Sequence, residues 1–185
     1  MGKAELRANC LARRLALDAQ QCAASSSRIR MHLHKLLAGA DRARLILAYL
    51  PFRKEPDLSA LFEELPLSWA LPRVVGSRLT WHTYDSTRLV MSEWGVHEPD
   101  PSCPSIKPDS AALVLVPLVA CDERGYRIGY GGGFYDRFLS VHQLATLGVG
   151  YGEFVLPYIP ADPWDQTLDG VVTEAGVRWF KSNNI

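Results

Sequence analysis

The longest apolar run in the chain, residues 111–121, is the feature that most constrains its fold. The run is interrupted by Pro117 and is far shorter than the ~20 apolar residues that a membrane-spanning helix requires. We therefore interpret it as a buried strand, strongest over residues 112–116. A buried strand must be covered by other elements, so the order of helices and strands around it decides the fold class.

Helices and strands alternate along the rest of the chain. Residues 3–16 lack Gly and Pro and are rich in strong helix formers. Asp18 with Gln21 resembles a capping box, which predicts a second helix up to Gly39. Two further helices are expected from residue 56 and over residues 135–142, and further strands at residues 44–50, 69–75, 79–84, 147–151 and 170–173.

This alternation predicts an α/β fold, specifically a single-domain, Rossmann-like three-layer sandwich over residues 1–185. We expect a mostly parallel central sheet with helices on both faces, and an N-terminal helical pair. In open sheets of this kind, ligands bind beyond the carboxyl ends of the strands. We therefore expect the functional site at that edge of the sheet.

Composition argues against several classes of function. The 185 residues are 48% hydrophobic and 22% charged, and Lys+Arg and Asp+Glu both total 20, so no net charge attracts nucleic acid or a membrane surface. The N-terminal residues lack the apolar stretch of a secretory signal. The four cysteines are scattered without a C-x-x-C pair, which argues against a zinc site or a disulfide framework. We expect a cytoplasmic monomer without nucleic-acid or membrane partners.

A glycine-rich segment between Arg127 and Asp136 carries the strongest chemical signal. Its glycines at positions 129, 131, 132 and 133 permit positive φ and allow a phosphate to approach main-chain N–H groups beside an expected helix start. The spacing matches neither a Walker motif nor G-x-G-x-x-G, and the glycines alone slightly favour a hairpin turn or a bulge. Their neighbours shift the balance towards an anion site, namely Arg127, Tyr130, Phe134, Tyr135 and Asp136.

The glycine-rich segment is part of a longer pattern. The pattern comprises Leu113-Val-Leu-Val-Pro117, Asp122, Gly125, Arg127, Gly129-Tyr-Gly-Gly-Gly-Phe-Tyr-Asp136-Arg137 and Leu139, with Lys3-x-x-Leu6-Arg7, Glu55-x-Asp57, Gly95-Val-His-Glu98-Pro99 and Leu168-Asp169-x-Val-Val-Thr-Glu174 elsewhere. This combination resembles the 5-formyltetrahydrofolate cyclo-ligases, also called methenyltetrahydrofolate synthetases, over nearly the whole chain. The resemblance implies a ligase that uses ATP and Mg²⁺ to convert 5-formyltetrahydrofolate to 5,10-methenyltetrahydrofolate, releasing ADP and phosphate.

The resemblance also assigns roles to single residues on the nucleotide side. Lys3 and Arg7, four residues apart on one helix face, would bind ATP phosphates together with Arg127, Gly129, Tyr130, Gly131, Gly132, Gly133, Phe134 and Tyr135. The implied catalytic set is Arg127, Tyr135 and Asp136, and the implied Mg²⁺ ligands are Asp136 and Asp169. Without the resemblance, Lys3 and Arg7 would be a solvated basic face, Asp136 a helix cap and Asp169 an ordinary loop acid.

The folate, with or without a polyglutamate tail, is the second substrate that the resemblance implies. Glu55 would accept hydrogen bonds from N–H groups of the pterin, and Leu50 would lie near the substrate. Trp94, Tyr130 and Phe134 would stack on the flat pterin ring. The alternatives are a first-turn helix acid for Glu55 and a core position for Trp94.

Three positions depart from the family pattern. The chain has Leu58 where Thr is usual, Leu118 where Gly is usual and Cys121 where Phe is usual. We expect Leu118 and Cys121 to alter packing beneath the glycine-rich segment, and Leu58 to change a helix cap or a substrate contact. These departures leave open a non-catalytic folate- or nucleotide-binding regulator derived from the family. A sugar-phosphate isomerase or acyl-CoA transferase on a similar framework is a third interpretation.

Overall fold

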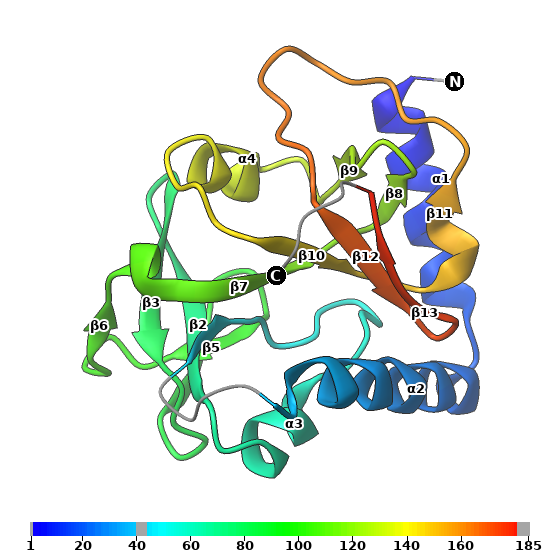
Figure 1. The fold of residues 1–185 in the computed structure, drawn as a ribbon. Helices are drawn as coiled ribbons and strands as arrows, with labels where there is room; N and C mark the ends of the chain where they lie inside the picture. Colours follow the sequence, from blue (N-terminus) through cyan, green and yellow to red (C-terminus); the bar gives the residue numbers. More distant parts are fainter. Residues whose placement is uncertain (1, 40–43, 181–185) are drawn as a thin grey trace.

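An eight-stranded sheet forms the centre of the protein in a computed structural model, which describes residues 2–39 and 44–180. Its strands are β1 (Leu45–Leu47), β2 (Ser68–Val75), β3 (Arg78–Thr83), β6 (Ser105–Ile106), β7 (Ala111–Pro117), β10 (Thr146–Val149), β12 (Gly170–Thr173) and β13 (Gly176–Trp179). They lie in the order β13-β12-β10-β7-β1-β2-β3-β6 (Figure 1). The expected mixed α/β class with a large central sheet is confirmed.

The five central strands are parallel, and antiparallel strands extend the sheet at both edges. The parallel strands lie in the order β2-β1-β7-β10-β12. If these five strands are numbered along the chain, their order in the sheet is 2-1-3-4-5. This is a doubly wound order in which the direction of winding reverses between β1 and β7. Ligands of such sheets bind at the carboxyl ends of the strands beside this reversal.

Burial on both faces explains why β7 reads as a continuous apolar run. Leu113 and Leu115 pack into one hydrophobic core, whereas Val114 and Val116 pack into the other. Successive side chains of a strand point to opposite faces, so a strand covered on both sides needs apolar residues at every position.

Helices cover the two faces of the sheet separately (Figure 1). Helices α2 (Ala19–Leu37) and α3 (Ser59–Glu64) lie on one face, and α4 (Phe134–Leu139) lies on the other. Buried residues of α2 recur at helical spacing, at Ile29, Leu33 and Leu37. No helix in the described part of the chain is long and apolar enough to span a bilayer.

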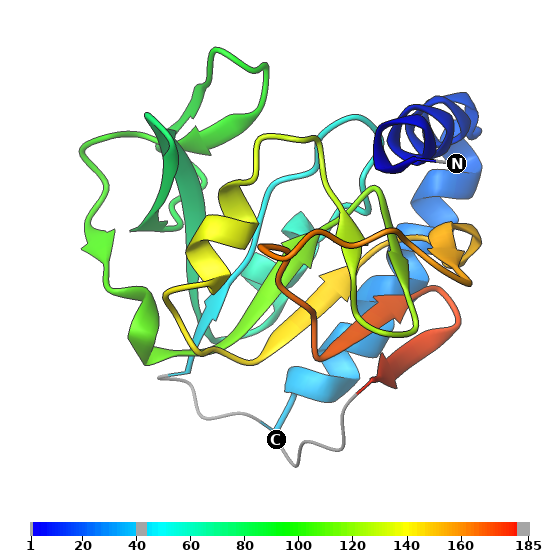
Figure 2. The same ribbon diagram turned by 90° about the horizontal axis from the view of Figure 1, so that it is seen from above.

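Helix α1 (Lys3–Ala16) lies beside a second, three-stranded sheet and not on a face of the central one (Figure 1). That sheet has the order β11-β8-β9 and consists of β8 (Ala120–Asp122), β9 (Arg127–Ile128) and β11 (Val155–Leu156). A separate hairpin is formed by β4 (Leu89–Met91) and β5 (His97–Pro99). Seen from above, α1 (dark blue) and this hairpin (green) lie on opposite sides of the glycine-rich segment (Figure 2).

The predicted start of the second helix is confirmed, because the Asp18 carboxylate accepts hydrogen bonds from the backbone N–H groups of Gln20 and Gln21 at 2.7 and 3.2 Å. The expected helix from residue 56 begins later, at Ser59, and a turn over residues 52–55 precedes it. Helix α4 ends at Leu139 and so is shorter than expected.

Candidate active site

A cleft of about 890 Å³ opens at the carboxyl ends of β1, β2 and β7, where the winding reverses. Its lining comes from α1, the segment after β1, the β4–β5 hairpin, the glycine-rich segment with α4, and the β11–β12 loop (residues 157–169). Every site residue expected from the sequence lines this cleft except Asp169. The fold therefore brings residues that are far apart in sequence to one place.

The glycine-rich segment connects β9 to α4, so it is not the hairpin turn that the glycines alone slightly favoured. Gly131 and Gly133 have φ values of +98° and +66°, which other residues rarely adopt. A Cβ atom on Gly132 would lie 2.5 Å from the ring of Phe134. The loop therefore needs glycine at these positions, and its main chain is open to the cleft.

Arg127 and Asp136 form an ion pair on one side of the cleft. Arg127 Nη1 lies 3.0 Å from Asp136 Oδ1, and it also donates to the carbonyl of Gln166 at 3.0 Å. The backbone N–H of Gln166 donates to the same Asp136 Oδ1 at 3.2 Å. The Arg127 side chain is only 4% exposed and that of Asp136 is 25% exposed, so the carboxylate is accessible whereas the guanidinium is fixed beneath it.

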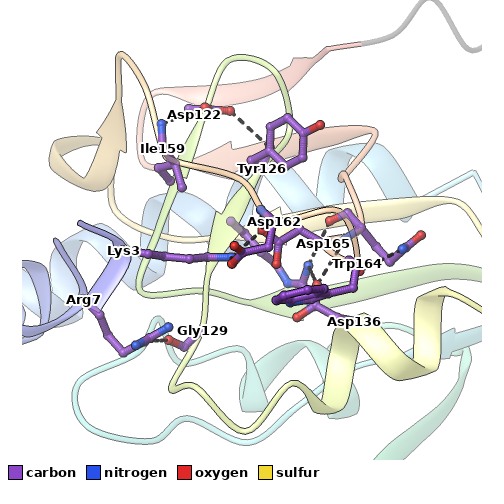
Figure 3. Close-up of polar contacts among 12 residues, drawn as sticks. Lys3, Arg7, Asp122, Tyr126, Gly129, Asp136, Ile159, Asp162, Trp164 and Asp165 are labelled. Atoms are coloured by element: carbon purple, nitrogen blue, oxygen red, sulfur yellow. Dashed lines mark hydrogen bonds and ion pairs between the residues drawn. The ribbon is translucent and has the colours of Figure 1, made fainter. Parts of the chain in front are cut away.

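Lys3 and Arg7 extend from α1 towards the glycine-rich segment and the β11–β12 loop (Figure 3). Arg7 Nε donates to the carbonyl of Gly129 at 2.8 Å. Lys3 Nζ pairs with the carboxylates of Asp162, at 3.3 Å, and Asp165. Because both cations lie on one face of the helix and line the cleft, the alternative of a freely solvated basic face is wrong.

The β11–β12 loop contributes residues that the sequence did not single out. Asp162, Trp164, Asp165 and Gln166 line the cleft, and Trp164 is 68% exposed. The loop is tied to the β8–β9 turn, because Ile159 N–H donates to the buried carboxylate of Asp122 at 3.0 Å (Figure 3). An exposed tryptophan between acids, in the order Asp-Pro-Trp-Asp, is the signal that could have identified this segment.

Glu55 occupies a buried position at the end of a turn. Its Oε1 accepts a hydrogen bond from the Tyr130 hydroxyl at 2.9 Å, and its Oε2 accepts one from the backbone N–H of Phe52 at 3.0 Å. Burial raises the pKa of Glu55 to about 7, although the Arg14 charge and these two hydrogen bonds oppose the rise. Glu55 is not a first-turn helix acid, because α3 begins at Ser59.

Tyr135 presents a buried hydroxyl without a hydrogen-bond partner among the described residues. Its ring lies edge-on to Trp81, with ring centroids 6.5 Å apart. Burial, and then the nearby Glu55, raise the pKa of Tyr135, so the phenol stays protonated. Buried hydroxyl groups nearly always have a partner, and because Tyr135 lines the cleft a ligand can supply one.

Trp94 lies at the turn of the β4–β5 hairpin and is 64% exposed, so the alternative of a core position is wrong. The hairpin is fixed to β2 by Arg73, whose Nη2 lies 2.9 Å from Glu98 Oε1. Leu50 and Phe134 line the same cleft. The apolar residues expected near the pterin are therefore gathered in one cleft with Glu55.

Asp169 immediately precedes β12 and does not line the cleft. Its carboxylate accepts hydrogen bonds from the backbone N–H and the hydroxyl of Thr146, at 2.9 and 3.0 Å. These bonds join the first residue of β10 to the residue before β12. Within residues 2–39 and 44–180, no three His, Cys, Asp or Glu side chains form a cluster that could hold a metal by themselves.

The three departures from the family pattern are buried packing residues. Leu58, Leu118 and Cys121 are each at most 2% exposed. Leu58 is the N-cap residue of α3 and makes no side-chain cap hydrogen bond there, as expected, whereas the preceding Asp57 carboxylate accepts a hydrogen bond from the Ser59 N–H at 2.9 Å. None of the three lines the cleft.

Known proteins with related sequences and structures point to one family. The family model described as 5-formyltetrahydrofolate cyclo-ligase matches residues 1–174. A 5-formyltetrahydrofolate cyclo-ligase of Escherichia coli strain K12 is 36% identical over 146 residues, covering 73% of this chain and 80% of that protein. The counterpart from Mycolicibacterium smegmatis is 36% identical over 143 residues, covering 70% and 73%. The solution structure of Aquifex aeolicus 5,10-methenyltetrahydrofolate synthetase aligns over 100% of this chain and 96% of that one, with a TM-score of 0.88 and 30% identity.

Proposed function

The chain belongs to the 5-formyltetrahydrofolate cyclo-ligase family and is an enzyme of that class, and we propose that it couples ATP to the conversion of 5-formyltetrahydrofolate to 5,10-methenyltetrahydrofolate. The observation that carries the proposal is the single cleft, which has cations and open main chain on one side and Glu55 with exposed apolar groups on the other. Such a cleft suits two anionic substrates that must react with each other.

The chemistry explains why ATP is required. The formyl group on N5 is amide-like, so its carbon is a poor electrophile and its oxygen a poor leaving group. The formyl oxygen attacks the γ-phosphorus of ATP, and the bond from that phosphorus to ADP breaks. N10 of the same folate then attacks the activated carbon and loses its proton. The C–O bond breaks, phosphate leaves with the bonding electrons, and the five-membered ring is closed.

The nucleotide side of the cleft supplies positive charge without a covalent nucleophile. Arg7 and Lys3 on α1 face the glycine-rich segment, whose main chain is open between Gly129 and Gly133. We place the ATP phosphates there, with Arg127 beneath them. Fixed cations and N–H donors stabilise the charge that develops during phosphoryl transfer.

Asp136 is the residue that we propose as the Mg²⁺ ligand. Mg²⁺ commonly takes only one or two protein carboxylates and fills its remaining positions with phosphate oxygens and water, so a cleft with one accessible aspartate fits this ion. Both hydrogen bonds described above use Asp136 Oδ1, which leaves Oδ2 for the metal. When bound, Mg²⁺ would neutralise charge on the phosphates. Asp169 is bonded to Thr146 and lies outside the cleft lining, so the proposal for the metal rests on Asp136.

The folate side of the cleft contains Glu55, Leu50 and Trp94. A pterin presents two neighbouring N–H groups that a carboxylate can accept together, and its flat ring can stack on an exposed indole. We propose that Glu55 binds these N–H groups and that Trp94, with Tyr130 and Phe134, contacts the ring. The Tyr135 hydroxyl would donate to the formyl oxygen or to the phosphoryl group that becomes attached to it.

We propose that the protein acts as a monomer, because the cleft has groups for both substrates and needs no residue from a second copy. The hypothesis of a non-catalytic regulator was based on three departures from the family pattern. These residues, Leu58, Leu118 and Cys121, are buried and do not line the cleft, so they no longer support that hypothesis. A sugar-phosphate isomerase or acyl-CoA transferase would act without ATP, so an ATP requirement separates these two alternatives from the proposed ligase.

The proposal is tested by mixing purified protein with 5-formyltetrahydrofolate, ATP and Mg²⁺ and following the near-ultraviolet absorption of the methenyl product. We expect absorption to rise only when all three are present, with one ADP formed per product. Binding of both substrates without any rise in absorption would select the regulator and reject the enzyme.

A further inference from the structure

A buried arginine lies behind the folate side of the cleft. Arg14, in the last turn of α1, is 1% exposed and is not among the residues that line the cleft. Its guanidinium donates to the carbonyls of Arg53 at 3.0 Å and Leu118 at 2.9 Å, and to the hydroxyl of Tyr130. None of the ion pairs within the described residues includes Arg14. A buried charge is costly unless an opposite charge compensates it. The charge of Arg14 must therefore be compensated through one of the three oxygens that accept its hydrogen bonds.

Tyr130 connects this charge to Glu55. The Tyr130 hydroxyl accepts from Arg14 and lies 2.9 Å from Glu55 Oε1 and 3.2 Å from the carbonyl of Phe52. A phenol has one hydrogen, and hydrogen bonds to a charged acceptor are the stronger ones. The hydrogen therefore goes to Glu55, and the hydrogen bonds run in one direction from Arg14 through Tyr130 to the carboxylate.

The end of α1 also fixes the turn that presents Glu55. Arg53 and Lys54 have φ values of +48° and +58°, which non-glycine residues rarely adopt without support. Arg14 holds the carbonyl of Arg53, and Lys54 Nζ donates to the carbonyls of Leu15 at 2.7 Å and Leu17 at 2.5 Å. Strained backbone next to a cleft is common at functional sites.

The groups around Glu55 differ in how they respond to pH. Tyr49, Tyr130 and Tyr135 all have a raised pKa, chiefly because they are buried, and so remain neutral phenols near pH 7. Arg14 stays charged, because a guanidinium is not deprotonated in proteins. Burial raises the pKa of Glu55 to about 7, and Arg14 is the first of the groups that lower it. His97 is another ionisable side chain that lines the cleft. The Glu55→Gln variant described below distinguishes the effect of Glu55 on the pH profile from that of other groups.

We propose that Arg14 is a positioning residue for the folate, acting through the Tyr130 hydroxyl to hold the Glu55 carboxylate charged and oriented for the pterin. Each carboxylate oxygen accepts one hydrogen bond from the protein and keeps a lone pair for one pterin N–H. The inference rests on the proposed function, because Glu55 is the group assigned there to the pterin.

Three variants and a matched control test this inference. Arg14→Gln removes the charge, Tyr130→Phe removes only the hydroxyl from a side chain that is 38% exposed, and Glu55→Gln removes the titrating group. The control is Arg13→Gln, because Arg13 is the neighbouring arginine of α1 and pairs with Glu153 outside the cleft lining. For each protein, kcat/KM for 5-formyltetrahydrofolate and KM for ATP are measured from pH 5.5 to 9.

For the wild type and Arg13→Gln, we expect kcat/KM for the folate to fall as the pH drops through about 7, where Glu55 becomes protonated. In Arg14→Gln and Tyr130→Phe this fall should begin about one pH unit higher, since loss of a nearby opposite charge or of a hydrogen bond to the charged form raises a carboxyl pKa. At pH 7 this amounts to a loss of about fivefold, which approaches about tenfold at lower pH, with KM for ATP unchanged. Glu55→Gln should be weak at every pH and lack the fall.

The inference is overturned if Tyr130→Phe and Arg14→Gln keep the wild-type pH profile, or if they weaken ATP and folate equally. If Arg14→Gln does not fold, Tyr130→Phe decides alone. A fall that persists in Glu55→Gln would show that a group other than Glu55 is responsible and would also reject the inference. Folate binding measured by calorimetry without ATP gives the same comparison independently of turnover, so a failure of the proposed reaction is distinguishable from a failure of this inference.

Discussion

The proposed role of Asp136 as the Mg²⁺ ligand can be tested with a single substitution. Asp136→Asn keeps an acceptor for the Gln166 N–H and for Arg127, so the fold should persist while the metal-binding charge is lost. We expect kcat to fall by about a hundredfold or more, with folate affinity nearly unchanged. Asp109→Asn is the control, because Asp109 pairs with His142 away from the cleft lining. Full Mg²⁺-dependent activity of Asp136→Asn would contradict the metal role.

Glu55 should make the stability of the protein depend on pH. Its pKa is about 7 in the folded protein and 4.5 in the absence of burial, so the folded state binds more protons between these values. Stability from this group is therefore fully present below about pH 4.5 and is lost as the pH rises through about 7. We expect the free energy of unfolding to fall by on the order of 2–3 kcal/mol over this range.

Urea unfolding at several pH values measures this dependence, and Glu55→Gln should remove that part of it. An identical pH dependence in the wild type and Glu55→Gln would show that Glu55 is not the group responsible.

Single residues of the site were predictable to the extent that they lie in recognisable motifs. Lys3, Arg7 and Glu55 were assigned by resemblance, and the structure brings all three to the cleft. Arg14 was missed because nothing in a helix rich in arginine marks one side chain as buried, and Trp164 was missed although it stands between two aspartates. Their positions depend on contacts between segments that are far apart in the sequence.

At the scale of elements, the β8–β9 turn packs closely against the residues that precede β12. Gly125 has a φ of +86°, and a Cβ atom there would lie 2.4 Å from the carbonyl oxygen of Leu168. Gly125→Ala should therefore cost about 3 kcal/mol or more, from backbone strain and overpacking together.

The matched control is Gly76→Ala. Gly76 has a φ of +58°, and a Cβ atom there would meet nothing within 4 Å, so the cost should be about 1 kcal/mol. Denaturant unfolding midpoints compare the two variants. Equal losses of stability would mean that the approach of Leu168 to Gly125 has no energetic consequence.

Elements with a strong local pattern were predictable, whereas short strands that depend on a neighbouring strand, such as β4 and β13, were not. Helix α2 has an apolar stripe and a cap, and β7 has an apolar residue at nearly every position, so local sequence was sufficient. Strands β4 and β13 have three and four residues and exist because a partner strand lies beside them. Their pairing is a tertiary contact, which local pattern does not encode.

At the scale of the whole molecule, α1 links the two sides of the cleft. Lys3 and Arg7 near its N-terminus contact the β11–β12 loop and the glycine-rich segment, whereas Arg14 near its C-terminus contacts Tyr130 and the turn before Glu55. The α/β class and the central sheet follow from the alternation of elements. The strand order, which locates the cleft, could not be predicted because it depends on how the crossover connections wind.

The central claim is that one cleft brings the γ-phosphoryl group of ATP to the formyl oxygen of the folate. The most direct measurement uses 5-formyltetrahydrofolate labelled with ¹⁸O in the formyl group and analyses the released phosphate by mass spectrometry. We expect one labelled oxygen in each phosphate, because the C–O bond breaks after the P–O bond has formed. Unlabelled phosphate, with the ¹⁸O recovered in water, would contradict the account.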